Sequence, residues 1–152
     1  MDMRTRLTNA LKEAMRAKEA ERLSTLRLIN AAIKDREIAA RGEGEDPGVS
    51  DDEVLAILSK MVKQRQESAR AYEEGGRLEL AEKELSEVKV IEEFLPRQLT
   101  EAETEAAIGA AIAEVGAASI RDMGRVMAAL KARHAGQMDF GKVGPAVKAR
   151  LG

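Results

Sequence analysis

The sequence predicts an all-α protein, and three observations support this fold class. First, 26 of the 152 residues are alanine and only Phe94, Phe140 and Tyr72 are aromatic, a composition that favours helices over strands. Second, hydrophobic residues recur at intervals of three and four, which places them on one face of a helix. Third, N-cap residues precede several of these segments and glycines follow them. The length suits one ordinary domain or two small ones.

Apolar spacing predicts two helices before the first glycine-rich stretch. The helix over about 2–17 has Met3, Leu7, Leu11 and Met15 on one face, and the helix over about 20–41 has Leu23, Leu26, Ile29 and Ile33. Residues 42–48 then form a predicted loop. This loop contains no lysine, carries three carboxylates and lacks the spacing of a P-loop, so we exclude it as a nucleotide site.

Two further helices are predicted before the domain boundary. Ser50 and Glu53 have the spacing of a capping box and open a helix that continues to Gly75-Gly76. A tight turn at these glycines leads into a helix of about 77–94, which Pro96 terminates. We therefore expect an N-terminal four-helix domain over residues 1–96 and a small three-helix domain over residues 97–152.

The three C-terminal helices are predicted mainly from their caps. Thr100 and Glu103 form a second capping box and open an alanine-rich helix that ends at Gly116. Ser119 is the expected N-cap of a helix over about 120–135. Gly144-Pro145 is the expected N-cap and first position of a short last helix.

Cysteine is absent from the chain and histidine occurs once. The chain contains no cysteine, which excludes disulfides, thiolate chemistry and cysteine-based zinc sites. Its one histidine, His134, continues the apolar stripe of Val126 and Leu130, so we interpret it as structural. No catalytic triad signature or metal-ligand spacing accompanies it, and we expect neither a metal nor a cofactor. With no signal-peptide pattern and no apolar run of membrane-spanning length, we expect no membrane association and a cytoplasmic location.

Two polar residues lie on predicted inward faces. Arg65 and Glu84 lie ten residues before and nine residues after Gly75, so an antiparallel hairpin turning there brings them to one level. We predict an interhelical Arg65–Glu84 ion pair that fixes the register of the hairpin, in preference to an acid–base pair, because a guanidinium does not titrate near neutrality. Asn30 is predicted to make an interhelical hydrogen bond.

Charge is distributed unevenly along the chain. The net charge is +4 over residues 1–41, −7 over 42–98, −4 over 99–120 and +5 over 121–152. Both chain ends are therefore basic and could contact phosphates. The candidate binding residues are Arg121 and Arg125, four apart beside exposed alanines, with Lys131 and Lys142 nearby. Because exposed aromatic residues for stacking on bases are almost absent, this surface suits structured RNA better than single strands.

Several short segments together resemble the YqeY family over nearly the whole chain. They are residues 26–34 (LRLINAAIK), Lys63-Gln64-Arg65 with Ser68 and Tyr72, Phe94-Leu95-Pro96 with Gln98-Leu99, and Met123-Gly124-Arg125-Val126-Met127 followed by Gly136, Asp139 and Gly141-Lys142. The C-terminal part is also similar to the tail domain of the B subunit of the tRNA-dependent amidotransferase. This resemblance implies a link to tRNA. Gly144-Pro145 departs from the polar pair often found in the family, which affects only the start of the last helix.

Three functions follow as hypotheses. The first is a non-catalytic accessory that binds tRNA or another structured RNA through Arg121, Arg125, Lys131 and Lys142, with an amidotransferase or synthetase component as a further partner. The second, implied by the resemblance alone, is carbon–nitrogen ligase activity with glutamine as amido donor, although the sequence supplies no glutaminase nucleophile or ATP site. The third is a protein-interaction adaptor that uses the acidic middle of the chain.

Overall fold

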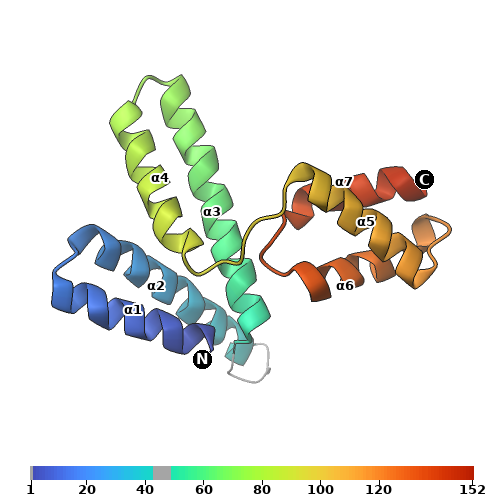
Figure 1. Cartoon of the computed structure of the whole chain (residues 1–152). Helices are drawn as coiled ribbons and strands as arrows, with labels where there is room; N and C mark the ends of the chain where they lie inside the picture. The colour runs from blue at the N-terminus through green and yellow to red at the C-terminus, as the bar shows by residue number, and fades with distance from the viewer. Residues whose placement is uncertain (1, 43–48) are drawn as a thin grey trace. The chain divides into compact units, whose positions relative to one another are not determined.

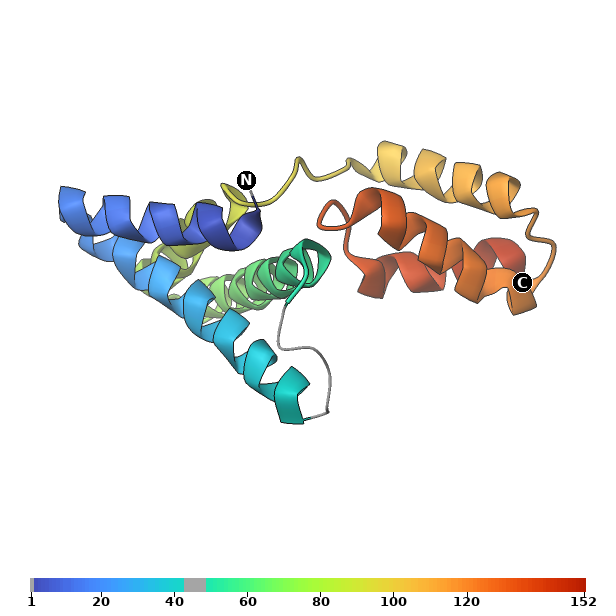
Figure 2. The same ribbon diagram turned by 90° about the horizontal axis from the view of Figure 1, so that it is seen from below.

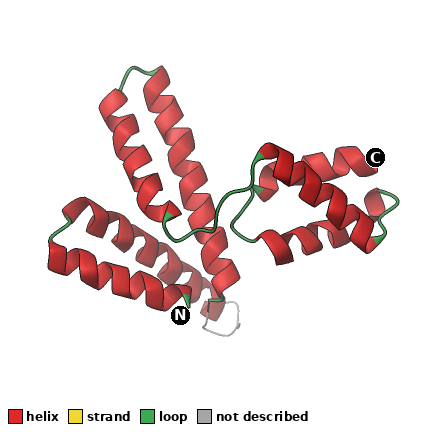
Figure 3. Ribbon diagram, in the orientation of Figure 1, coloured by secondary structure: helices red, strands yellow, loops and turns green. Residues whose placement is uncertain are grey.

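The computed structural model describes residues 2–42 and 49–152, and every regular element in these residues is helical (Figures 1 and 3). The predicted all-α class is confirmed. The predicted loop lies outside the described residues except for Gly42, which ends a helix. The chain divides into two compact units, one up to Leu95 and one from Pro96 onwards.

The first unit consists of two helical hairpins. Helices α1 (Met3–Ala17) and α2 (Ala20–Gly42) form one hairpin, and α3 (Asp51–Glu74) and α4 (Leu78–Glu92) form the other (Figures 1 and 2). The apolar stripes expected on the first two helices meet α3 and α4 in one core, except that Met15 is 54% exposed and Ala14 is buried in its place. Its fully buried side chains include Ile29, Ile33, Val54, Leu58 and Ile91.

Different turns close the two hairpins. Lys18 follows α1 in the left-handed region with φ 57°, a conformation that glycine usually provides at a helix C-terminus. Gly76, with φ 74°, supplies the corresponding turn between α3 and α4. Ser50 caps α3 by accepting a hydrogen bond from the backbone N–H of Glu53, as predicted. The carboxylate of Glu53 accepts a hydrogen bond from Nε of Arg36.

The second unit has a separate core. It contains α5 (Glu101–Val115), the short 3₁₀ helix η1 (Ile120–Asp122), α6 (Met123–His134) and α7 (Phe140–Leu151). Thr100 and Glu103 form the predicted capping box at the start of α5. The buried side chains are Ile108, Ala111, Val126, Leu130, Met138, Val143 and Val147.

The predicted start of the last helix is wrong. Helix α7 begins at Phe140, because the side chain of Asp139 accepts a hydrogen bond from the Gly141 N–H at 2.9 Å and caps the helix there. Pro145 consequently lies inside α7 instead of at its first position. Its missing N–H leaves the carbonyl of Gly141 without the usual helical bond. A side-chain cap thus begins the helix earlier than the Gly-Pro signal indicated.

The segment that enters the second unit is fixed to the connection between α6 and α7. The N–H of Leu99 donates to the carbonyl of Gln137 at 2.9 Å, and the side-chain amide of Gln98 donates to the carbonyl of Gly136. The side-chain amide of Gln137 donates in turn to the carbonyl of Arg97 at 3.1 Å. Backbone groups outside the helices are satisfied in this way.

Candidate nucleic-acid interface

The turn between α5 and α6 determines where the two candidate arginines lie. The carboxylate of Asp122 accepts backbone N–H bonds from Ala118 and Ser119 at 2.9 and 3.3 Å, and Arg125 donates to it at 2.7 Å. These bonds, led by the one from Ala118, lower the pKa of Asp122 to about 2. The turn is therefore held by a carboxylate that stays ionised throughout the neutral range.

Arg121 and Arg125 differ in what their guanidinium groups contact. Arg125 donates to Asp122 and also to the backbone carbonyl of Val115 at 3.1 Å, so it caps the end of α5 while its side chain stays 61% exposed. Arg121 is exposed; its backbone N–H donates to the hydroxyl of Ser119, and its guanidinium has no ion-pair partner among residues 2–42 and 49–152. Arg121 is thus available to an external anion, and Arg125 is partly committed to the fold.

The two candidate lysines lie on another flank of the unit. Lys131 is exposed, with its ammonium 5.9 Å from the centre of the Phe140 ring. It follows Arg125 by six residues, which is about 240° around a helix. Lys142 is exposed in the first turn of α7. The candidate residues are therefore distributed over η1, α6 and the first turn of α7, where the sequence suggested one compact cluster.

The acidic residues of this region are used internally. Residues 121–152 carry seven basic residues but only Asp122 and Asp139 as acids. Both aspartates accept backbone N–H bonds at helix starts. Exposed cations also include Lys148 on α7, whereas Arg133 pairs with Glu114 of α5. The outer charge of α6 and α7 is therefore predominantly positive.

His134 has the structural role that the sequence indicated. It is half-buried at the end of α6, and its Nδ1 lies 3.0 Å from the side-chain oxygen of Gln137. Because Gln137 also holds the entering segment, the imidazole supports the connection between α6 and α7. No serine or threonine hydroxyl bonds to this imidazole in the part of the chain that is described.

The predicted Arg65–Glu84 ion pair is wrong, because Arg65 pairs with Glu87. The Nε of Arg65 lies 2.8 Å from the Glu87 carboxylate, and its Nη1 donates to the carbonyl of Met61. The midpoint between residues 65 and 87 is Gly76, the residue with positive φ at which the hairpin turns. The hairpin therefore turns later than predicted. Leu80 and Leu85, the apolar neighbours of Glu84 on α4, are each 39% exposed.

Asn30 makes the interhelical hydrogen bond that the sequence predicted. Its side-chain oxygen accepts from Arg4 of α1 at 2.9 Å, and Arg4 also pairs with Glu37 at 3.1 Å. These contacts mark the seam along which α1 packs on α2.

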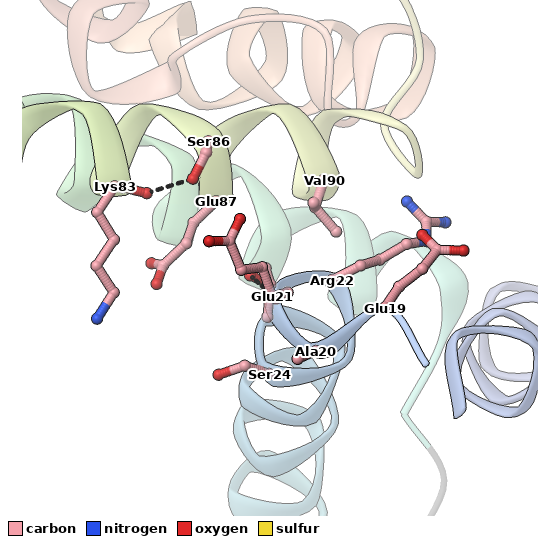
Figure 4. Close-up of a pocket in the computed structure, with 10 residues that line it drawn as sticks. Glu19, Ala20, Glu21, Arg22, Ser24, Lys83, Ser86, Glu87 and Val90 are labelled. Carbon is pink, nitrogen blue, oxygen red and sulfur yellow. Dashed lines mark hydrogen bonds between the residues drawn. The ribbon is translucent and has the colours of Figure 1, made fainter. Parts of the chain in front are cut away.

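A shallow groove of about 690 Å³ separates the beginning of α2 from α4 (Figure 4). Two of its hydroxyl groups are engaged locally, since Thr25 donates to the carbonyl of Glu21 and Ser86 to that of Lys83. Glu87, on the wall of the groove, accepts a hydrogen bond from Arg65. Neither of these two hydroxyls donates to a side-chain base.

Residues 2–42 and 49–152 offer neither a cluster of metal-ligating side chains nor a membrane-spanning helix. No group of three or more histidine, aspartate or glutamate side chains there could hold a metal ion. None of the helices described combines the length and the apolar character needed to cross a bilayer.

Comparison with known proteins gives one family and a set of fungal relatives. Residues 4–151 match the family model described as Yqey-like protein. A protein of Lachancea thermotolerans named "Altered inheritance of mitochondria protein 41, mitochondrial" is 32% identical over 117 residues, covering 76% of this chain and 60% of the relative. Proteins of the same name from Eremothecium gossypii and Clavispora lusitaniae are 35% and 38% identical, over 62% and 56% of this chain and 49% and 46% of theirs.

These matches concern the share of the relatives that the chain covers and the location expected from the sequence. The chain spans only about half to three fifths of the length of these relatives. The expectation of a cytoplasmic location is wrong by this comparison, because the relatives are named as mitochondrial proteins. Absence of cysteine and of a signal-peptide pattern cannot distinguish one reducing compartment from another.

Proposed function

Because this chain belongs to the Yqey-like protein family, we propose that it is a non-catalytic accessory protein that binds tRNA or another structured RNA. The binding surface in this proposal is the basic band of the second unit, formed by Arg121, Lys131 and Lys142. Arg125 supports the band by fixing the turn before α6. An amidotransferase or synthetase component is the protein partner that fits such an accessory role.

One observation carries the proposal, namely the sequestration of acidic groups in the region. Asp122 and Asp139 are bound to backbone N–H groups, while Arg121, Lys131 and Lys142 remain exposed. A surface with fixed positive charge attracts phosphate backbones, and it does so without reading bases. The resemblance of this segment to the tail domain of the amidotransferase B subunit favours tRNA among structured RNAs.

The test is a titration of the full chain with tRNA over a salt series. The triple variant Arg121→Gln/Lys131→Gln/Lys142→Gln should bind tRNA more weakly than the parent. The slope of log affinity against log salt concentration should be smaller in magnitude by about 2 to 3, since each lost phosphate contact removes about 0.7–0.9 from this slope. The matched control removes the same charge from the α3–α4 hairpin, as Lys60→Gln/Lys83→Gln/Lys89→Gln, and should bind like the parent. Absence of salt-dependent binding by the parent in dilute buffer would end the proposal.

Glutamine-dependent amide transfer is the catalytic alternative that the family resemblance implies. We do not adopt it, because the sequence supplies no glutaminase nucleophile or ATP site and because two groove hydroxyls, those of Thr25 and Ser86, donate to backbone carbonyls and not to a base. Glutamine hydrolysis measured with and without tRNA separates the two functions. Activity of the purified chain alone would favour the enzyme.

A further inference from the structure

The α1–α2 hairpin carries a second set of exposed cations that the proposed function does not use. On α1, the buried residues Met3, Leu7 and Ala14 define the inner side, and Lys12 and Arg16 lie four residues apart on the opposite, exposed side. Arg16 stands in the last turn of α1, next to the connection into α2.

Helix α2 repeats this arrangement. Arg27, Ala31 and Lys34 follow each other at intervals of four and three residues and are all exposed, while Ile29 and Ile33 face the core. Arg27 and Lys34 are therefore about 10 Å apart along one stripe of the helix. Both belong to the segment 26–34 on which the family resemblance rests.

The seam between the helices shows that both stripes lie on one side of the hairpin. Arg4 of α1 contacts Asn30 and Glu37 of α2, so these residues mark where the helices meet. Arg27 and Lys34 each precede one of these α2 residues by three positions, which places them about 60° from the seam towards solvent. On α1, Lys12 is displaced from Arg4 by about 80° around the helix axis, towards the same side of the hairpin.

Few acidic side chains stand on this side. Glu37 is paired with Arg4, and Asp2 caps α1 by accepting from the Thr5 N–H. Glu13, about 60° around α1 from Arg16, and Asp35, about 100° around α2 from Lys34, lie at the outer edges of the two cationic stripes. Lys12, Arg16, Arg27 and Lys34 thus form what we call the N-terminal basic face.

We propose that the N-terminal basic face is a second contact for the phosphate backbone of the RNA; this rests on the proposed function. From the level of Arg16 to Lys34 the face extends roughly 20 Å along the hairpin, long enough to follow several successive phosphates. None of its four cations has an ion-pair partner among the described residues.

Its composition favours a nucleic-acid backbone over an anionic membrane. A helix that binds at a membrane surface inserts a continuous apolar face, usually with aromatic residues. The exposed large apolar side chains of the hairpin are Met15 on α1 at 54% and Leu28 and Ile38 on α2 at 44% and 65%, and they are too scattered to form a continuous apolar face. No aromatic side chain for stacking on bases stands among the four cations.

The experiment compares four proteins in tRNA titrations over a salt series. They are the parent, the C-terminal triple variant defined above, the face variant Lys12→Gln/Arg16→Gln/Arg27→Gln/Lys34→Gln, and a control with the same charge change on the other hairpin, Lys60→Gln/Arg70→Gln/Lys83→Gln/Lys89→Gln. All substituted residues of the face and the control are exposed, and far-UV circular dichroism checks that each variant is folded.

We expect the face variant to bind tRNA at least tenfold more weakly than the control, with a salt slope about 3 lower than that of the parent. A face variant that binds like the control, while the C-terminal triple variant is weakened, would overturn this inference and leave the proposed function standing. A parent that does not bind tRNA would overturn both. Vesicles rich in anionic lipid are titrated in parallel, and binding to them but not to tRNA, lost only in the face variant, would assign the face to membranes instead.

Discussion

The partner of Arg65 gives the sharpest test of the structure, because two glutamates on α4 compete for that role. Replacing Glu87 by alanine removes a hydrogen bond of 2.8 Å between side chains that are only 15% and 17% exposed. Hydrogen bonds to charged groups contribute about 1.5–3 kcal/mol, and loss of one partner of a fully buried pair costs about 3–5 kcal/mol. For this nearly buried pair we expect Glu87→Ala to lower the free energy of unfolding by about 2–3 kcal/mol.

The matched control is Glu84→Ala, which should change the free energy of unfolding by less than about 0.5 kcal/mol. Urea unfolding followed by tyrosine fluorescence suits this comparison, because Tyr72 is the only tyrosine, tryptophan is absent, and α3 belongs to the first unit. A double-mutant cycle with Arg65→Met isolates the pairwise contribution. Equal losses for the two glutamate variants would refute the register in which Gly76 is the centre of the hairpin.

Three further predictions concern two helix ends and a proline inside α7. The pKa of Asp122 is lowered to about 2 from an ordinary value of 3.8, so its contribution to stability is complete above about pH 4 and is lost as the pH falls towards 2. Carbon-13 NMR of the carboxyl group should show a titration midpoint at this lowered pKa, and a midpoint near 4 would contradict the capping geometry. Lys18→Gly should raise the free energy of unfolding by about 1 kcal/mol in the tyrosine-fluorescence assay by relieving the left-handed backbone, and no gain relative to Lys18→Ala would argue against that conformation. Pro145→Ala should stabilise the second unit by about 1–3 kcal/mol in thermal unfolding, since it restores a hydrogen bond inside α7, whereas a loss of stability would favour a helix that begins at Pro145.

Local signals in the sequence were sufficient for most helix boundaries. Thr100 and Glu103 predicted the start of α5 because both partners of a capping box lie within four residues of each other. The start of α7 was missed where two local signals competed, since Asp139 and Gly144 are both acceptable caps. Asp139 prevails because its carboxylate reaches the Gly141 N–H.

Features that depend on helix packing were harder to predict. The inward position of Arg65 was predicted correctly. Its partner depends on where the hairpin turns, and an error of one to two residues in the position of the turn led to Glu84 being predicted in place of Glu87. For the candidate interface, the ion pair between Asp122 and Arg125 was not predicted, although the two residues are only three positions apart. The bond from Arg125 to the Val115 carbonyl depends on how α6 approaches the end of α5, which the spacing of residues does not contain.

The use of aspartates as helix caps in the second unit couples its architecture to its electrostatic potential. Asp122 and Asp139 accept backbone N–H bonds at the turns that precede α6 and α7, so the only two negative charges of residues 121–152 are engaged by the backbone. A substitution at either aspartate therefore changes both the stability of a helix start and the charge of the surface. Exchanging either aspartate for a neutral residue makes the outside more cationic but loosens the helix that displays the cations, so a gain in attraction for a polyanion is offset by a less rigid platform.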